Sequence, residues 1–207
     1  MFYLVRTHWW LKIFYPGCVW EVKTREKELF FTFDDGPHPV ATPFVLAELE
    51  KYNAKATFFC IGKNVKENEN LYSSILREGH AVGNHTYNHL NAWKTKDKAY
   101  LENIFEAKQI ITSNLFRPPY GRISNFIIAR LKGEKYKLKT IMWSVLSGDF
   151  DKSLSNKRCY LNVVRNAKRG SIIVFHDSEK AFEKLSYTLP RVLKYFSERG
   201  YVFKSID

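Results

Sequence analysis

Only three cysteines occur among the 207 residues: Cys18, Cys60 and Cys159. They form no C-x-x-C pair, which excludes a disulfide framework and the usual zinc-finger spacings. We expect free, buried thiols, a state typical of a reducing compartment. The sequence also lacks an arginine-rich run and an aromatic RNA-binding signature, although its net charge is +12. Its lysines and arginines are scattered among acids, as on solvated helix faces, so we expect no nucleic-acid partner.

Long hydrophobic runs are missing as well, even from the aromatic first twenty residues. Arg6, His8 and Lys12 interrupt this stretch, and no small-residue cleavage site follows it. We therefore expect neither a cleavable signal peptide nor a transmembrane helix, and a cytoplasmic rather than a membrane-peripheral or exported protein. Two interpretations of the segment stay open. We favour a cover packed on the outside of the domain over peripheral contact with a membrane interface.

The remaining composition is that of a soluble protein with one sizeable core. Hydrophobic residues make up 45% and charged residues 26%, values ordinary for a globular domain. Aromatic residues are abundant at 16%. We expect most of them in the core, although aromatic rings also line sugar-binding grooves. We expect a monomer.

Strand-like and helix-like segments alternate along the chain. We expect strands at 29–33, 56–61, 81–83, 115–117, 140–145, 171–175 and 201–206, and helices at 42–52, 64–78, 95–114, 155–169 and 188–199. Seven strands at this spacing match βαβ units, whose right-handed crossovers can close into a barrel. The sequence thus predicts an α/β domain over residues 29–207, preceded by an aromatic-rich extension over residues 1–28 that packs on it.

Two motifs place potential metal ligands at the ends of predicted strands. In LFFTFDDGPHP, Asp34 and Asp35 follow an apolar strand and precede a Gly-Pro turn. Both carboxylates should therefore lie at the C-terminal rim, where parallel barrels build active sites. In GNHTYNH, His85 and His89 stand four residues apart and could share a metal. With one carboxylate they would form a His₂Asp set that leaves room for water and substrate.

Three further motifs carry groups suited to acid–base chemistry. In FRPPYG, two prolines stiffen the chain between Arg117 and Tyr120, and an arginine near two carboxylates can hold one of them ionised. In GSIIVFHDS, the strand ends at His176, a candidate general acid because imidazole titrates near neutrality. In WSVLSGDFD, either Asp149 or Asp151 could pair with this histidine and raise its pKa.

The motifs TFDDGP, HTYNH, RPPYG, SGDF and IVFH resemble, in order and approximate spacing, those of the polysaccharide deacetylase family, carbohydrate esterase family 4. Its domain also occurs in chitooligosaccharide deacetylases. The resemblance extends from about Leu29 to the C-terminus. It implies a distorted (β/α)7 barrel similar to a TIM barrel, with an open side as the substrate groove. It also implies metal-dependent removal of N-acetyl groups from N-acetylglucosamine-containing glycans, either peptidoglycan or chitin-like, with release of acetate.

The same resemblance implies four catalytic residues. Asp34 resembles the family's catalytic base, and Arg117 resembles the arginine that orients this base. His176 resembles the catalytic acid, and Asp149 resembles the acid that tunes it. An activated water would attack the amide carbonyl while Asp34 takes its proton, and His176 would donate a proton to the leaving amine.

The resemblance further implies three metal ligands: Asp35, His85 and His89. We expect Zn²⁺, with Co²⁺ or Ni²⁺ as alternatives. The implied substrate-binding residues are Pro119, Tyr120, Phe150 and Ile173. Among these, the Tyr120 N–H would join the oxyanion hole, and Ile173 would form an apolar wall for the acetyl methyl group. Two positions depart from the family pattern, because Leu146 replaces a common aspartate and Phe150 a common tryptophan.

Two other functions stay open. The same site could support a related metal-dependent hydrolysis, such as O-deacetylation of xylan, deformylation of a sugar or opening of a cyclic imide. An inactive carbohydrate-binding module would be expected to lack at least one of Asp34, Asp35, His85, His89 or His176. All five are present.

Overall fold

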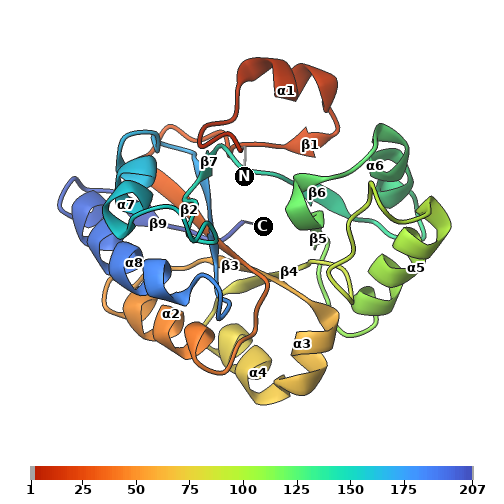
Figure 1. The fold of residues 1–207 in the computed structure, drawn as a ribbon, viewed down its shortest axis with the longest axis horizontal. Helices are drawn as coiled ribbons and strands as arrows, with labels where there is room; N and C mark the ends of the chain where they lie inside the picture. Colours follow the sequence, from red (N-terminus) through yellow and green to blue (C-terminus); the bar gives the residue numbers. More distant parts are fainter. Residues whose placement is uncertain (1–2, 207) are drawn as a thin grey trace.

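The computed structural model describes residues 3–206 and has a curled sheet of parallel strands at its centre, surrounded by helices (Figure 1). The strands are β1 (Cys18–Val19), β2 (Glu28–Asp34), β3 (Thr57–Cys60), β4 (Ala81–Asn84), β5 (Leu115–Phe116), β6 (Lys139–Ile141), β7 (Val145–Leu146), β8 (Ile172–His176) and β9 (Val202–Phe203). Their order is β1-β6-β5-β4-β3-β2-β8-β7, and β9 pairs with β2. All these pairings are parallel, which confirms the predicted α/β barrel.

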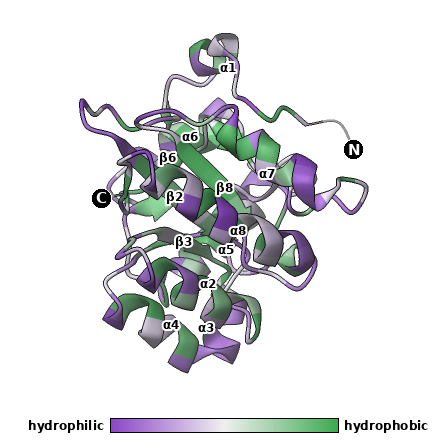
Figure 2. Ribbon diagram, turned by 90° about the vertical axis from the view of Figure 1, so that its left-hand side faces the viewer, coloured by the Kyte–Doolittle hydropathy of each residue, from purple (hydrophilic) through white to green (hydrophobic). Residues whose placement is uncertain are grey.

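The helices lie around the outside of this sheet (Figure 1). They are α1 (Trp9–Phe14), α2 (Ala41–Glu50), α3 (Gly62–Glu67), α4 (Glu69–Arg77), α5 (Asp97–Lys108), the 3₁₀ turn η1 (Pro119–Gly121), α6 (Asn125–Lys132), α7 (Asn156–Val164) and α8 (Phe182–Ser197). Hydrophobic colour is concentrated on the central strands, whereas the outer helices carry most of the hydrophilic residues (Figure 2).

The core has two layers because successive strand residues face opposite sides of the sheet. On β2, Phe31 and Phe33 pack with α8 residues such as Leu189 in the layer between sheet and helices. Phe30, on the same strand, packs with Ile172 inside the barrel. The central strands β2, β3, β4 and β8 are therefore almost wholly buried, as expected of parallel strands covered by helices.

Several predicted elements differ from the observed ones in length. The predicted strand 140–145 is two strands, because Met142 donates its N–H to Val19 O and Ser144 donates to Ile172 O, so the chain changes neighbours between β6 and β7. The predicted helix 64–78 is broken at Asn68, which has φ −134° and ψ 48°. Three short elements, α1, β1 and α6, were missed.

Other boundaries moved by several residues. The predicted strand 201–206 contains only the two residues of β9, and the predicted helix 95–114 ends at Lys108. Helix α8 begins at Phe182, six residues before the predicted start, and continues through Pro190. Cys60 and Cys159 are buried and Cys18 is partly buried, and all three are free, as expected.

Backbone hydrogen bonds connect the segment before β2 to both edges of the sheet. β1 pairs with β6 at one end. At the other end, Leu146 of β7 donates its N–H to Val5 O over 2.8 Å, and Arg6 forms an antiparallel bridge with Val145. The segment thus spans the gap between β6 and β7. Within residues 3–206, no helix is both long and apolar enough to cross a membrane.

Candidate active site

A cavity of about 710 Å³ opens at the C-terminal ends of the parallel strands. β2 ends at Asp34, β4 ends one residue before His85, and β8 ends at His176. Asp34, Asp35, His85, His89 and His176 all line the cavity. The tertiary structure therefore brings together ionisable residues from three separate motifs at the rim where parallel barrels carry their chemistry.

Asp35, His85 and His89 form a group that could hold a metal ion. Their potential ligand atoms all lie within 4.8 Å of one another. Asp35 Oδ1 is 3.7 Å from His85 Nε2 and 3.2 Å from His89 Nε2. This oxygen is buried and has no hydrogen-bond partner among the described residues. A buried carboxylate oxygen facing two imidazole nitrogens fits a divalent cation.

The environment of His85 prepares it as a ligand. Its Nδ1 donates to the carbonyl oxygen of Arg117 over 2.8 Å, in the tautomer that leaves the Nε2 lone pair facing Asp35. Burial lowers the pKa of His85 to about 4, although nearby carboxylates oppose this effect. The ring is therefore neutral at pH 7, which is the form that binds metals.

Backbone strain is concentrated at the same rim. Asp35, Thr86, His89 and Tyr120 have φ values of 81°, 64°, 55° and 60°, in the left-handed region that non-glycine residues seldom adopt. The loop geometry is held by polar contacts, since Asn64 Nδ2 donates to Asp35 O over 2.7 Å. Strain of this kind persists where surrounding contacts impose it, and it is typical of functional sites.

Asp34 is held by a fully buried arginine. Arg117 Nη1 donates to Asp34 Oδ1 over 2.6 Å and to Thr32 Oγ1 over 2.7 Å. Its Nη2 donates to Met142 O over 3.0 Å, and its Nε donates to Ile141 O. Burial lowers the pKa of Arg117, while Asp34 opposes this effect. A charge-assisted contact of this length holds the carboxylate in one orientation.

His176 is held by Asp149, which resolves the choice between Asp149 and Asp151. Asp149 Oδ1 lies 2.8 Å from His176 Nδ1, and its Oδ2 accepts the His176 backbone N–H over 2.7 Å. Burial by itself lowers the pKa of His176, but the Asp149 carboxylate outweighs it and raises the pKa to about 9. The ring is therefore protonated at neutral pH, and Nε2 is its remaining donor.

Tyr120 supplies a free backbone donor at the cavity. Its N–H makes no hydrogen bond to any of residues 3–206, whereas the next two N–H groups donate to Pro118 and Pro119. The Tyr120 ring is 55% exposed and lies against His89, with 4.7 Å between ring centroids. A fixed, unpaired N–H beside the metal group can stabilise a developing oxyanion.

Two predicted substrate-binding residues do not line the cavity. Ile173 is fully buried between the sheet and the helices, and the wall position belongs to Val174. The reason is strand parity, because Val174 and His176 are two residues apart and share a face. Pro119 is likewise buried outside the cavity lining, and Pro118 lines it instead.

The N-terminal segment contributes to the cavity lining, which its sequence did not predict. The cavity lining from this segment comprises Tyr3, Leu4, Thr7, Leu11, Tyr15, Cys18 and Trp20. The Tyr3 ring lies 5.1 Å from that of Phe150, which in turn lies 5.1 Å from the His176 ring. The many aromatic residues of the segment could have indicated that it lines a sugar-binding cavity. We had instead expected the segment to be a cover on the outside of the domain.

Asp177 was also missed as a residue that positions the Asp34–Asp35 loop. Its Oδ1 accepts the Gly36 N–H over 3.1 Å, and its Oδ2 accepts the Thr42 hydroxyl over 2.5 Å. A Cβ at position 36 would collide with the Asp177 carboxylate, so only glycine fits there. Burial raises the pKa of Asp177 to about 8, although the Thr42 hydrogen bond opposes this effect.

The chain is also similar in sequence to known proteins. Residues 21–138 match the family model described as polysaccharide deacetylase. The chain is 37% identical to a peptidoglycan-N-acetylglucosamine deacetylase of Bacillus cereus over 194 residues, which cover 91% of this chain and 90% of the relative. It is 33% identical to a chitooligosaccharide deacetylase of Azorhizobium caulinodans over 172 residues, or 78% and 79% of the two chains.

The fold is also similar to solved structures. A crystal structure of a peptidoglycan N-acetylglucosamine deacetylase, in complex with a naphthalenyl N-oxidanyl-benzamide, superposes with a TM-score of 0.86. The two sequences are 28% identical, and the match covers 97% of this chain and 95% of the other. The likeness therefore includes the N-terminal segment that precedes the family match.

Proposed function

Because this chain belongs to the polysaccharide deacetylase family, we propose that it hydrolyses the N-acetyl group of N-acetylglucosamine-containing glycans, either peptidoglycan or chitin-like, and releases acetate. One observation carries the proposal. The Asp35–His85–His89 group lines the same cavity as Asp34 and His176. Amide hydrolysis needs a base, an electrophilic centre and an acid within reach of one substrate, and these residues can supply all three.

Asp35, His85 and His89 would hold the metal ion. Two imidazole nitrogens and one carboxylate oxygen suit Zn²⁺, while Co²⁺ and Ni²⁺ accept the same donors. When bound, such an ion lowers the pKa of water and polarises a carbonyl group.

The protein's own groups would then manage the protons. Asp34, oriented by Arg117 Nη1 at 2.6 Å, would accept the proton of the attacking water. The free N–H of Tyr120 would donate to the oxyanion that develops from the acetyl carbonyl. His176, protonated because of Asp149, would donate to the amine as the C–N bond breaks. Asp149 and Arg117 do not line the cavity and would act by positioning these two groups.

The cavity walls would orient the sugar and its acetyl group. Leu146 and Val174 provide an apolar surface suited to the acetyl methyl group. Phe150 lies beside His176 and would contact the sugar on the side of the leaving amine. Tyr3, packed on Phe150, would extend this aromatic wall toward a neighbouring sugar unit.

Acetate release tests the proposal directly. The protein, loaded with Zn²⁺ and with its metal content measured, is incubated with N-acetylglucosamine oligomers, peptidoglycan fragments, acetylated xylan, an N-formyl sugar and a cyclic imide. We expect acetate from the N-acetylated glycans, and little product from the other substrates. Asp34→Asn is the matched inactive control, because it preserves the shape of the side chain. Metal-loaded protein that cleaves only xylan esters, formyl groups or imides would contradict the proposed substrate class.

A further inference from the structure

Helix α1 exposes an apolar surface at the end of the molecule. Trp9 is 71% exposed, Ile13 and Phe14 are each 65% exposed, and Trp10 is 42% exposed. No residue of this helix is buried. Figures 1 and 2 both show α1 standing apart from the helices that cover the sheet. We call these four side chains the α1 surface, and their exposure to water costs free energy that a partner could recover.

The neighbouring helix α6 also exposes an aromatic side chain. Asn125, the first residue of α6, donates its side-chain N–H to Phe14 O over 3.1 Å and so connects the two helices. The next residue, Phe126, is 54% exposed, and the guanidinium of Arg130 lies 5.5 Å from its ring. The helix that contacts α1 thus carries an exposed aromatic ring with a cation beside it.

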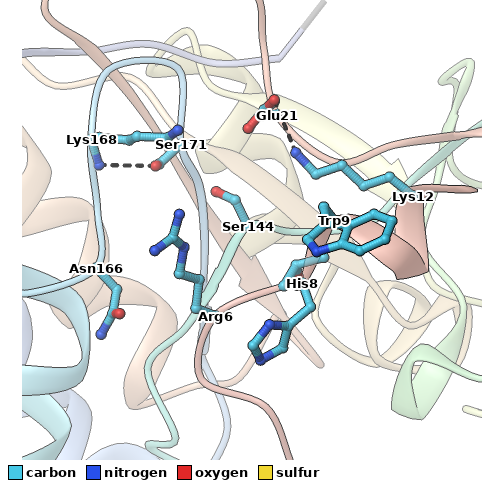
Figure 3. Close-up of a pocket in the computed structure, with 10 residues that line it drawn as sticks. Arg6, His8, Trp9, Lys12, Glu21, Ser144, Asn166, Lys168 and Ser171 are labelled. Atoms are coloured by element: carbon cyan, nitrogen blue, oxygen red, sulfur yellow. Dashed lines mark hydrogen bonds and ion pairs between the residues drawn. The ribbon is translucent and has the colours of Figure 1, made fainter.

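A basic pocket of about 420 Å³ lies beside the α1 surface and includes Trp9 in its lining (Figure 3). Its lining contains three permanent cations, Arg6, Lys12 and Lys168, and one carboxylate, that of Glu21. Glu21 is paired with Lys12 over 2.9 Å, and the pair lies apart from Arg6 in Figure 3. The side-chain cations of Arg6 and Lys168 have no hydrogen-bond or ion-pair partner within the described part of the chain.

We propose that the α1 surface and the basic pocket together dock on an anionic lipid bilayer, with a headgroup phosphate in the pocket. Tryptophan and other apolar side chains next to cations are the composition of interfacial membrane-binding segments. Arg6 and Lys168 provide the charge complementary to a phosphate. A second copy of this protein is a poorer partner, because each copy carries a net charge of +12 and presents the same cations.

This docking surface is separate from the proposed deacetylase chemistry. Thr7 lines both cavities, so the N-terminal segment forms a wall between the basic pocket and the active-site cavity. None of the exposed side chains of the α1 surface lines the active-site cavity. Binding to lipid and turnover of a soluble oligosaccharide can therefore be measured independently.

Vesicle flotation tests the apolar part of the proposal. The full chain is mixed with vesicles of phosphatidylglycerol and phosphatidylcholine in equal parts, or of phosphatidylcholine alone. We expect flotation with the mixed vesicles at low salt and release at high salt. Ile13→Ser/Phe14→Ser should weaken binding about tenfold. The matched control is Leu76→Ser/Val202→Ser, which removes two side chains exposed by 47% and 49% elsewhere, and it should bind as the wild type does.

A charge-reversal pair tests the basic pocket. Arg6→Glu/Lys168→Glu should weaken binding to the mixed vesicles about tenfold or more. Lys66→Glu/Lys157→Glu makes the same change in net charge at exposed positions on α3 and α7, outside the pocket lining, and should weaken binding much less. Unchanged melting temperatures show that the variants are folded. Their release of acetate from a soluble oligosaccharide should equal that of the wild type.

The outcomes separate the proposal from its competitors. Absence of flotation at low salt, or equal flotation with pure phosphatidylcholine, overturns it. Equal losses in the test and control pairs also overturn it, because binding would then follow net charge or general hydrophobicity alone. Dimerisation that is abolished by Ile13→Ser/Phe14→Ser, without vesicle binding, would assign the surface to a second copy of the chain. Vesicle binding in a protein without deacetylase activity would leave this proposal standing and overturn the proposed function only.

Discussion

Replacing Asp149 by asparagine should shift the alkaline limit of activity while leaving the acid limit in place. The two Asp149 oxygens contact His176 Nδ1 at 2.8 Å and the His176 N–H at 2.7 Å. Asparagine keeps the size of the side chain but removes its charge. Because burial by itself lowers the pKa of His176, the loss of this charge should return the pKa from about 9 to about 6.5 or below.

The size of the effect follows from the proton occupancy of His176. A pKa change from about 9 to about 6.5 corresponds to roughly 3 kcal/mol. At pH 8 the ring would be about 90% protonated in the wild type and about 3% protonated in the variant, so kcat/KM should fall about thirty-fold. At pH 6 both forms are mostly protonated, and the difference should nearly vanish.

The assay is the pH profile of kcat/KM for acetate release from a soluble N-acetylglucosamine oligomer. Asp151→Asn is the matched control, since it removes the same charge two residues away without contacting His176. We expect its alkaline limit to match that of the wild type. An unchanged alkaline limit in Asp149→Asn would refute the assignment of His176 as the acid tuned by Asp149.

The His176–Asp149 pair should also affect the stability of the fold. The pKa of His176 is higher in the folded protein than in the unfolded chain. The contribution of protonated His176 to the free energy of unfolding is therefore fully present below about pH 6.5 and is lost as the pH rises through about 9. The melting temperature of the wild type should fall over this range, and that of Asp149→Asn should fall less.

Three further tests concern other parts of the site. Asp35→Ala should lose bound metal, whereas Asp34→Asn should keep it and lose about 10²–10⁴-fold in kcat. The metal content of both purified variants is measured, and full occupancy in Asp35→Ala would contradict the assignment of Asp35 as a ligand. Tyr3→Ala should raise KM roughly fivefold for longer oligomers and leave kcat unchanged, because one aromatic contact with the sugar is lost. An unchanged KM would contradict the assignment of Tyr3 to the substrate-binding wall. Asp177→Ala should lower the free energy of unfolding by about 2 kcal/mol at pH 6, because it removes two hydrogen bonds, whereas Asp177→Asn should be tolerated. The raised pKa of Asp177 stabilises the fold at low pH, and this contribution is lost as the pH rises through about 8. The wild-type melting temperature should therefore fall more between pH 6 and 9 than that of Asp177→Asn, and parallel melting curves would contradict the raised pKa.

Local patterns were sufficient to predict which ionisable side chains stand at the strand ends. Asp34, Asp35 and His176 follow apolar runs, so the position of each at the rim follows from the run that precedes it. His85 and His89 were paired by their spacing alone. These predictions depended on interactions within about ten residues, which is the range over which sequence pattern and geometry are tightly coupled.

Strand parity was available from the sequence but was not used. Once His176 is placed toward the cavity, residues at even spacing on the same strand must face it too, so Val174 rather than Ile173 lines the wall. The same alternation of side chains places Ile173 in the layer between the sheet and the helices.

Only the tertiary structure decided which distant groups meet. Asp149 rather than Asp151 contacts His176, across 27 positions in the sequence, and Arg117 reaches Asp34 across 83. Likewise, pairing with β6 and β7 carries the N-terminal segment onto the active-site cavity and leaves the outer side of α1 exposed. Motifs within the sequence determined which functional groups this protein has. Contacts between distant segments determined which of them share a cavity, because strand register and backbone hydrogen bonds between those segments depend on the whole sheet.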